Sequence, residues 1–426
     1  MGVLSILWHY GRAKRLRFTQ RAPLLAHQQR QWRRFERQVL ARSPYFQPYC
    51  GQPLAQWPMM DKAVLMRDFD RINTAGLGLD EVWQTAMAAE RSRDFSSSLN
   101  GYDVGLSSGT SAQRGVFVVS AAERARWAGV ILAKLLPRGL RHPERVALIL
   151  RANNNLYEGV GRSRRLRFQF FDLMQAFAPL CADLQRYQPS IIVAPAQVLC
   201  ALAQAVQQGR LMMPPLRVIS AAEVLSAADR QLLQSVFGQV HEVYQATEGF
   251  LAATCAHGRL HLNEEYVLFE EEWLDEQRFV PIITDFTRRT QPMVRYRLDD
   301  VLTLDPRPCP CGSATRVLAA IEGRLGDVVR LPGQAGEPVA LFADALNRVF
   351  ALTLPRQADY QLTQTGPDGL RLAVAGDAAL WAQMQQALMA YFQQQGVATA
   401  GLSWQRAELP VVPRDQKRRR IQVAYA

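Results

Sequence analysis

Residues 107–115 bring together side chains that can bind phosphate. Four hydroxyl side chains, two glycines and an arginine lie in this segment: Ser107, Ser108, Gly109, Thr110, Ser111, Arg114 and Gly115. Hydroxyls, backbone N–H groups and a guanidinium can converge on phosphate oxygens, and glycine allows the backbone to approach them closely. Apolar residues typical of β-strands flank the segment on both sides. The pattern predicts a phosphate-binding loop, although an exposed serine-rich turn has the same composition.

Two other common phosphate-binding patterns are missing from the sequence. The P-loop pattern G-x-x-x-x-G-K-[ST] does not occur, and no G-x-G-x-x-G opens a helix after a strand. The predicted loop at residues 107–115 is therefore a different kind of phosphate site.

Three cysteines and a histidine have the spacing of a metal site. Cys255 and His261 form C-x5-H, and Cys309 and Cys311 form C-x-C. Thiolates with one imidazole suit a closed tetrahedral Zn²⁺ site, which would be structural because no coordination position stays open. His257 is a competing ligand, and unligated cysteines in a turn are the alternative.

The other three cysteines, Cys50, Cys181 and Cys200, lie among apolar neighbours and are expected to be buried thiols. Six cysteines in 426 residues are too few and too scattered for a disulfide framework.

The net charge of +12 is concentrated at the two ends of the chain. Residues 1–42 contain ten basic residues and one acidic residue, and residues 414–426 contain five basic residues and one acidic residue. The rest of the chain is close to neutral, which argues against a nucleic-acid-binding protein. The N-terminal excess indicates a solvated helix face or, at most, a weak contact with an anionic membrane.

The composition fits a globular enzyme, with 48% hydrophobic residues and no apolar run long enough to span a bilayer. A short apolar stretch precedes the basic cluster at the N-terminus, the reverse of a signal peptide, so we expect a cytoplasmic protein.

Strand and helix patterns alternate between residues 145 and 255. We expect strands at 145–152, 190–196 and 216–223, a strand running into a loop at 240–249, and helices at 171–187, 196–209 and 226–238. This alternation predicts a mostly parallel sheet covered by helices. Ligands bind beyond the carboxyl ends of such strands, where the segments "SAAE" and "YQATE" fall.

Other patterns occupy the two flanks. Residues 24–41 have the spacing of an amphipathic helix, and the residues after 258 form short strands and turns typical of an antiparallel β subdomain. Residues 323–327 are a plausible joint, followed by about 100 residues of small α+β domain. We therefore expect a large α/β domain over 1–323 and a small C-terminal domain over 324–426.

Six short segments follow one another in a characteristic order. They are residues 107–111 "SSGTS", 221–223 "AAE", 244–248 "YQATE", 296–300 "YRLDD", 323–327 "GRLGD" and 413–417 "PRDQK". Each alone has an ordinary explanation, since Glu223 could cap a helix and Asp300 could end a strand. Together they resemble the adenylate-forming (acyl-CoA synthetase) superfamily, and most closely its phenylacetate-CoA ligase branch with CapK-like and coenzyme F390 synthetase-like relatives. The resemblance extends over nearly the whole chain, including "YFQPY" at 45–49 and "WPMMDKAVLMRDFD" at 57–70.

The resemblance implies roles for individual residues. Residues 107–115 would hold the β- and γ-phosphates of ATP, Ala221, Ala222 and Glu223 would lie beside the adenine, and Tyr244 would stack on it. Thr247 would bond the α-phosphate, Glu248 would coordinate Mg²⁺ and Asp300 would accept hydrogen bonds from the ribose hydroxyls. Arg324 would lie near the same ribose, and Lys417 would stabilise charge on the transferring phosphoryl group. The "CPCG" turn at 309–312 is similar to a turn that some members of the branch use to bind zinc.

The chain departs from the family pattern at three places. The phosphate loop is one residue shorter and carries Arg114 in place of lysine, which still supplies charge. Gly326 stands where the family has Asp or Lys, and Gln416 stands where it has glycine. Lys417 is followed by three arginines, so this run has the alternative reading of a solvated tail.

The implied activity is ATP-dependent activation of a carboxylic acid as an acyl-adenylate with release of pyrophosphate. The resemblance implies an aromatic or aryl-acetic acid, rotation of the small domain about residues 324–327, and acyl transfer to coenzyme A. Transfer to an amine, nucleotidyl transfer like that of coenzyme F390 synthetase, and a catalytically inactive ATP-binding protein are the alternatives. The expected ligands are ATP, Mg²⁺, coenzyme A and a structural Zn²⁺, and the oligomeric state stays open.

Overall fold

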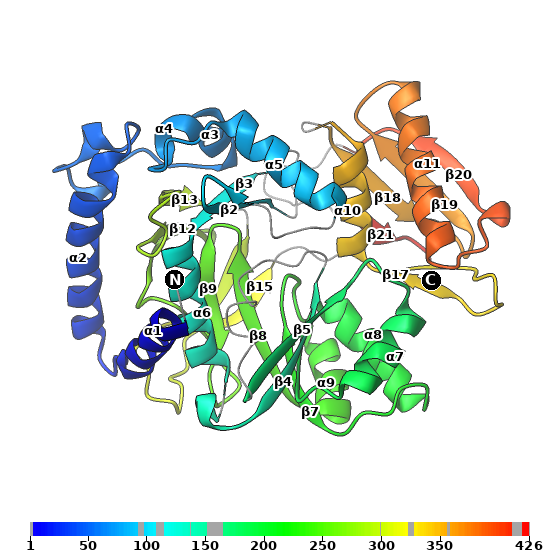
Figure 1. Ribbon diagram of the computed structural model, residues 1–426, viewed down its shortest axis with the longest axis horizontal. Coiled ribbons are helices and arrows are strands. Elements are labelled where there is room, and N and C mark those ends of the chain that lie inside the picture. The colour runs from blue at the N-terminus through cyan, green and yellow to red at the C-terminus, as the bar shows by residue number, and fades with distance from the viewer. Residues whose placement is uncertain are drawn as a thin grey trace.

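A mixed sheet of 12 strands forms the centre of the structure, a computed structural model that describes residues 3–92, 98–107, 115–136, 138–150, 165–298, 300–322, 328–355, 358–410 and 420–425 (Figure 1). The strands follow the order β11-β12-β14-β15-β10-β9-β8-β7-β6-β4-β5, and β13 pairs with β12. From β8 to β5 all neighbouring strands are parallel, and from β9 to β11 they are antiparallel.

The parallel half alternates with helices, as the sequence predicts. Its strands are β4 (Glu144–Leu150), β5 (Leu166–Asp172), β6 (Ile191–Ala194), β7 (Leu216–Ser220) and β8 (Gly238–Ala246). Its helices are α7 (Phe177–Tyr187), α8 (Ala196–Gln207) and α9 (Ala227–Phe237). All four residues of β6 are apolar and buried, which is typical of a strand covered on both faces.

The two faces of this half pack against different helices. Alternate residues such as Ala147 and Ile192 contact α7, α8 and α9, whereas Val146 and Ile191 face α6 (Ala121–Leu135). Because side chains alternate along a strand, this arrangement gives three layers, with the sheet in the middle.

The sequence did not predict strand β5. We expected a helix over 171–187, but residues up to Asp172 belong to β5 and α7 begins at Phe177. β5 is an edge strand with polar residues among its aromatic ones, and Phe170-Phe171 directly precedes the helical pattern. The apolar residues of the strand are therefore followed so closely by those of the helix that the sequence does not show where one pattern ends.

The antiparallel half is a continuation of the same sheet, whereas the sequence suggested a separate subdomain. Its strands are β9 (Gly249–Thr254), β10 (Leu260–Leu262), β11 (Val267–Trp273), β12 (Arg278–Asp285), β13 (Met293–Arg297), β14 (Val301–Asp305) and β15 (Val317–Glu322). The two halves join at the hairpin between β8 and β9, where Ala246 pairs with Gly249. Thr247 and Glu248 form the turn of this hairpin.

The N-terminal segment lies along the left and the top of the molecule in Figure 1. Its helices are α1 (Val3–Arg15), α2 (Arg21–Gln38), α3 (Lys62–Arg67), α4 (Phe69–Ile72) and α5 (Leu79–Ser92), with 3-10 turns at Leu40–Arg42, Gln47–Tyr49 and Leu54–Gln56. A small sheet of β1 (Ser98–Leu99), β2 (Tyr102–Leu106) and β3 (Val116–Ser120) precedes α6, and a 3-10 turn at Gly139–Arg141 follows it. Helix α2 confirms the amphipathic helix expected at 24–41.

The C-terminal part is a small α/β domain, as expected. It contains β16 (Val329–Leu331), β17 (Val339–Leu341), α10 (Ala343–Thr353), β18 (Tyr360–Gln364), β19 (Gly369–Val374), α11 (Ala378–Gln394), a 3-10 turn at Thr399–Gly401, β20 (Ser403–Ala407) and β21 (Ile421–Val423). Its four-stranded sheet has the order β20-β19-β18-β21. The predicted fold class is confirmed. The predicted joint at 323–327 lies outside the described residues, so the boundary between 1–323 and 324–426 stays a prediction.

The C-terminal domain packs on the parallel half. The Phe177 and Phe342 rings lie with their centroids 6.1 Å apart, and the Gln395 side chain donates a 2.7 Å hydrogen bond to the Met174 carbonyl. Arg348, which is only 1% exposed, donates to the Glu90 carbonyl on α5. Within the part of the chain that the structure describes, no helix has the length and apolarity needed to cross a bilayer.

Candidate functional site

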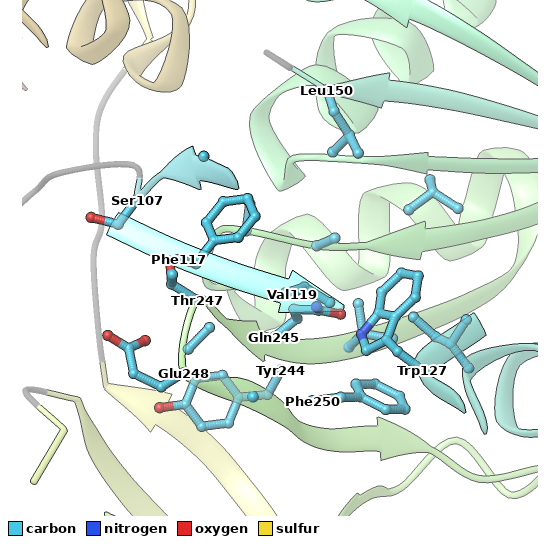
Figure 2. Close-up of a pocket in the computed structure, with 18 of the residues that line it drawn as sticks. Ser107, Phe117, Val119, Trp127, Leu150, Tyr244, Gln245, Thr247, Glu248 and Phe250 are labelled. Atoms are coloured by element: carbon cyan, nitrogen blue, oxygen red, sulfur yellow. The ribbon is translucent and has the colours of Figure 1, made fainter. Parts of the chain in front are cut away.

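A pocket of about 440 Å³ opens at the carboxyl ends of β7 and β8 (Figure 2). Four segments that are far apart in the sequence line it: Ser107, residues 221–223, residues 244–248 and Asp300. The pocket lies within the size range of small-molecule sites, and it is located where ligands bind in open α/β sheets. Figure 2 shows Ser107, Thr247 and Glu248 on one side of the pocket and Trp127 and Phe250 on the other.

The segment after β7 turns sharply at the edge of the pocket. Ala221 donates its backbone N–H to the Ala194 carbonyl at 3.0 Å, and Ala222 has a positive φ of 68°, which is uncommon for a residue with a Cβ. The Glu223 carboxylate accepts the backbone N–H of Gln197 at 3.1 Å, in the first turn of α8. Glu223 therefore both lines the pocket and satisfies a helix N-terminus.

The β8–β9 hairpin holds Tyr244, Thr247 and Glu248 along the same edge. The Tyr244 hydroxyl donates a 2.7 Å hydrogen bond to Oδ2 of Asp300, which directly precedes β14. Gly249 is required here because a Cβ at this position would lie 2.6 Å from Oδ2 of Asp285.

The ends of the predicted phosphate loop close on each other. Ser107 donates its N–H to the Gly115 carbonyl at 2.8 Å, and its hydroxyl accepts the Gly115 N–H at 2.8 Å. Ser107 lines the pocket, and Gly115 is hydrogen-bonded to Ser107. The remaining predicted residues of this loop, Ser108, Gly109, Thr110, Ser111 and Arg114, lie outside the described residues, as do Arg324, Gly326 and Lys417.

Glu123, Trp127, Asp285 and Arg288 are among the pocket-lining residues that sequence reasoning missed. Glu123 begins α6 in a capping box with Ser120, and the pattern S-x-x-E at 120–123 was the available signal. Asp285 is buried, and burial raises the pKa of its carboxyl, which Thr287 bonds through its N–H at 2.7 Å.

Glu123 holds the backbone of residues 289 and 290 beside the pocket. Its carboxylate accepts the backbone N–H groups of Arg289 at 2.6 Å and Thr290 at 2.9 Å. Burial alone would raise the pKa of Glu123. The positive charge of Arg288, with hydrogen bonds from Ser120 and Thr290, outweighs burial and lowers this pKa.

A second cluster lies at the other ends of β9 and β14. The ligand atoms of Cys255, His261, Cys309 and Cys311 all lie within 4.8 Å of one another. Sγ of Cys255 is 3.7 Å from Sγ of Cys309, and Sγ of Cys311 is 3.4 Å from Nε2 of His261. His257 is not part of this group, and the other cysteines are half-buried thiols.

The donor set fits tetrahedral zinc. Zn–S bonds of about 2.3 Å and Zn–N bonds of about 2.0 Å imply ligand separations of about 3.8 Å between thiolates and about 3.5 Å from thiolate to imidazole. Nδ1 of His261 lies 3.2 Å from the Thr315 carbonyl, which leaves Nε2 free to face the cysteines. Burial is the main cause that lowers the pKa of His261, and the neutral imidazole is the form that binds a metal.

Solved structures with the same architecture cover most of the chain. A structure of 2-hydroxyisobutyryl-CoA ligase with 2-HIB-AMP and CoA in the thioesterification state aligns over 91% of this chain and 85% of that chain, with 16% identity and a TM-score of 0.55. An open conformation of that ligase aligns over 95% and 91%, with 16% identity and a TM-score of 0.51. The chain has the fold of an adenylate-forming enzyme. No protein-family model matches the sequence, and no curated protein matches it.

Within this adenylate-forming fold, we predict that Glu123 stabilises the pocket wall through its charge. Glu123→Gln should lower the free energy of unfolding by about 2 kcal/mol at about pH 7, because it weakens several buried hydrogen bonds to a charged group. A carboxyl whose pKa is lowered by folding stabilises the protein above its ordinary value of 4.5, and this contribution disappears as the pH falls through the folded pKa. The difference between the variant and the unsubstituted protein should therefore shrink in acid.

Urea unfolding at several pH values measures this difference. Glu81→Gln is the matched control, because Glu81 is an exposed acidic residue in the first turn of α5. The control should change stability by less than about 0.5 kcal/mol. Equal stability of the Glu123 variant and the unsubstituted protein at every pH would contradict the prediction.

Proposed function

We propose that the chain is an adenylate-forming enzyme that activates a carboxylic acid with Mg-ATP. The observation that carries this proposal is the convergence of Ser107, residues 221–223, residues 244–248 and Asp300 on one pocket. These are four of the six segments by which the sequence resembles the adenylate-forming superfamily. These segments are far apart in the sequence and meet only in the folded chain, so their common position supports a shared ligand.

The geometry suits a nucleotide that spans the pocket edge. Asp300 and Tyr244 are joined by a hydrogen bond, so the proposed ribose acceptor and the proposed adenine-stacking ring hold each other in place. The Thr247 hydroxyl and the Glu248 carboxylate, at the next positions along the hairpin, would face the α-phosphate and Mg²⁺. Ser107, on the same side of the pocket as Thr247 and Glu248, would receive the terminal phosphates.

In the proposed reaction a carboxylate oxygen of the acid attacks the α-phosphorus. A bond forms between these atoms, the bond to the bridging oxygen breaks, and pyrophosphate leaves with the electron pair. Positioning and neutralisation of charge supply most of the catalysis in such transfers. Mg²⁺ bound at Glu248 would neutralise phosphate charge, and Arg114, Arg324 and Lys417 would add positive charge.

The acid class and the acyl acceptor follow from the resemblance. An aromatic or aryl-acetic acid and coenzyme A are the expected partners in the phenylacetate-CoA ligase branch. The 2-hydroxyisobutyryl-CoA ligase with the same fold was solved with an acyl-AMP and CoA. Transfer to an amine requires the same first half-reaction.

We predict acid-dependent ATP–pyrophosphate exchange in the absence of coenzyme A. Asp300→Asn should raise the KM for ATP at least about tenfold, since it removes a charged acceptor worth about 1.5–3 kcal/mol. Asp275→Asn is the control, because Asp275 lies in the exposed turn between β11 and β12 and does not line the pocket.

Three results would contradict the proposal. Exchange without any acid would argue against acid activation. A stable adenylylated product would identify a nucleotidyl transferase. ATP binding without exchange across aryl, aryl-acetic and fatty acids would identify an inactive nucleotide-binding protein.

The cysteine–histidine cluster supports a second proposal, a structural zinc ion that joins the β9–β10 and β14–β15 hairpins. Protein purified from zinc-supplemented cells should contain about one zinc per chain, measured by mass spectrometry of the metal. Cys309→Ser should lower the zinc content at least tenfold and lower the melting temperature. Cys50→Ser, which changes a half-buried cysteine away from the cluster, should leave the zinc content unchanged. Metal-free native protein with an unchanged melting temperature after chelation would contradict the zinc site.

A further inference from the structure

The pocket continues from the nucleotide edge into an apolar space between α6 and the sheet, which we call the apolar gallery. Trp127, Ile131 and Leu135 of α6 line one side of the gallery, and Val146, Leu148 and Leu150 of β4 line the other. These residues are spaced at helical and at alternating strand positions, so each set forms one continuous wall.

The depth of the gallery can be measured along either wall. Along α6 the lining residues extend from Trp127 to Leu135, which corresponds to about 12 Å at the rise of a helix, and Leu136 directly follows the helix. On β4 the lining residues extend from Leu150 to Val146, which corresponds to about 13 Å at the rise of a strand. The lengths of the two walls agree, so the gallery is much deeper than a single aromatic ring.

The walls between these limits carry no charge. Among the described residues, every pocket-lining side chain on α6 from Trp127 onward, and on strands β4, β5, β6 and β7, is apolar. The charged lining residues, such as Glu123 and Asp300, belong to the other end of the pocket. A polar group on a ligand would lose its hydrogen bonds in the gallery at a large cost in free energy.

The gallery lies within a hydrophobic core and yet is not filled by side chains. Val146, Leu148 and Ile131 are each less than 10% exposed and belong to one apolar cluster. Protein interiors are packed so densely that voids larger than water are few, and apolar cavities bind apolar ligands. The space therefore fits an apolar part of the substrate.

We propose that the acid activated by this chain has a long, unbranched apolar tail that extends along the gallery. This inference rests on the proposed acid activation, and it changes the expected substrate from a single-ring aromatic acid to a medium- or long-chain fatty acid. The carboxylate lies at the nucleotide edge near Thr247, and the tail extends past Trp127 toward Leu136. The depth of the gallery sets the upper limit of the chain length.

A series of saturated acids from butanoic to hexadecanoic acid, with phenylacetic acid for comparison, tests the inference by ATP–pyrophosphate exchange. Each added methylene should raise kcat/KM about fourfold until the gallery is full, as expected from the free energy of burying a CH₂ group. Decanoic acid should therefore exceed phenylacetic acid by at least tenfold. A preference for phenylacetic acid over every fatty acid would overturn the inference and leave acid activation intact.

Substitutions at two depths test the position of the tail. Ala128→Phe, near the mouth of the gallery, should lower kcat/KM for decanoic acid at least tenfold and leave butanoic acid within about twofold. Ala122→Phe is the control, since Ala122 is an exposed residue of the same helix outside the pocket lining. Leu136→Ala, at the far end, should shift the optimum to longer acids. An unchanged length profile in both gallery variants would overturn the inference.

Binding without ATP separates the two proposals. Titration calorimetry with decanoate should detect binding that is at least tenfold weaker in the Ala128→Phe variant. If no acid supports exchange but decanoate binds in this way, acid activation fails and the gallery remains a fatty-acid site. If exchange occurs but decanoate neither binds nor reacts, the gallery inference fails alone.

A different observation concerns the outer face of α1. Leu4, Leu7 and Trp8 lie on one side of this helix and are 82%, 43% and 58% exposed. The opposite side is locked on α6, because Ile6 is buried there and Gly129 of α6 approaches so closely that a Cβ would lie 2.7 Å from the Ile6 carbonyl oxygen. The apolar face is therefore held rigidly on the outside of the molecule.

Positive charge lies next to this face. Arg12 and Arg15 continue the exposed side of α1, and the Arg12 guanidinium lies 5.5 Å from the centroid of the Trp8 ring. Residues 1–42 contain ten basic residues and one acidic residue, whereas the central part of the chain is nearly neutral. Apolar and tryptophan side chains next to arginines are the composition of helices that lie in the interface of anionic bilayers.

We infer that the outer face of α1 docks on an anionic lipid surface. Cosedimentation with phosphatidylcholine vesicles, with and without phosphatidylglycerol, measures this binding. Phosphatidylglycerol should raise binding at least about tenfold at low salt, and high salt should reverse the gain. The double variant Leu4→Glu, Trp8→Glu should bind at least tenfold more weakly.

Met212→Glu is the matched control, because Met212 is 76% exposed and lies away from α1. It should bind vesicles like the unsubstituted protein. The inference would be overturned if the double variant bound vesicles as well as the unsubstituted protein, or if binding did not depend on phosphatidylglycerol. A double variant that changes only the elution volume in gel filtration would assign the face to a second copy of the chain instead.

Discussion

The Tyr244 hydroxyl donates a 2.7 Å hydrogen bond to Asp300, and this contact links the two halves of the sheet across the pocket edge. Tyr244 belongs to β8, the last parallel strand, and Asp300 directly precedes β14 in the antiparallel half. The contact depends on the β8–β9 hairpin, because the two-residue turn at Thr247 and Glu248 is where the strand direction reverses. Both residues line the pocket at this point. A turn of different length would shift the register of β9 and move the residues of the pocket edge together.

The two faces of the parallel half are used for different purposes. Ala147, Ile192 and Val218 pack against α7, α8 and α9 in a continuous core that also includes apolar residues of the C-terminal domain. On the other face α6 lies over Val146 and Ile191 but leaves the gallery between them. Glu123 anchors the first turn of α6 to the β12–β13 loop, so the spacing between helix and sheet is set at the polar end of the pocket. Hydrogen bonds to the charged Glu123 therefore hold the helix at the mouth of the gallery, and apolar contacts hold it along the rest of the gallery.

Sequence reasoning succeeded where a segment has a distinctive pattern of residue types and failed where apolar residues have the same pattern in either environment. The alternation of strands and helices at 190–246 predicted the parallel sheet, and "YQATE" predicted the end of β8, because apolar runs followed by polar turn residues are distinctive. The gallery could not be predicted, since Leu148 or Ile131 has the same pattern whether it faces another side chain or an empty space. Strand β5 was missed because its apolar residues merge with those that precede α7. Glu123 had a readable capping pattern, but its bonds to Arg289 and Thr290 depend on contacts between distant segments.

The cysteine–histidine cluster and the pocket edge lie at opposite ends of the same strands. β9 starts at Gly249, next to Glu248, and ends at Thr254, next to Cys255. β14 starts at Val301, next to Asp300, and ends at Asp305, shortly before Cys309. Each strand therefore follows a pocket residue at its first end and is followed by a residue of the cysteine–histidine cluster beyond its last. A metal ion that joins the far ends would limit the movement of β9 relative to β14, because it would link two strands that are separated in the sheet by β10 and β15. The cluster can thus act on the pocket as a positioning device without contacting any ligand, and the distance between Glu248 and Asp300 is the quantity it would control.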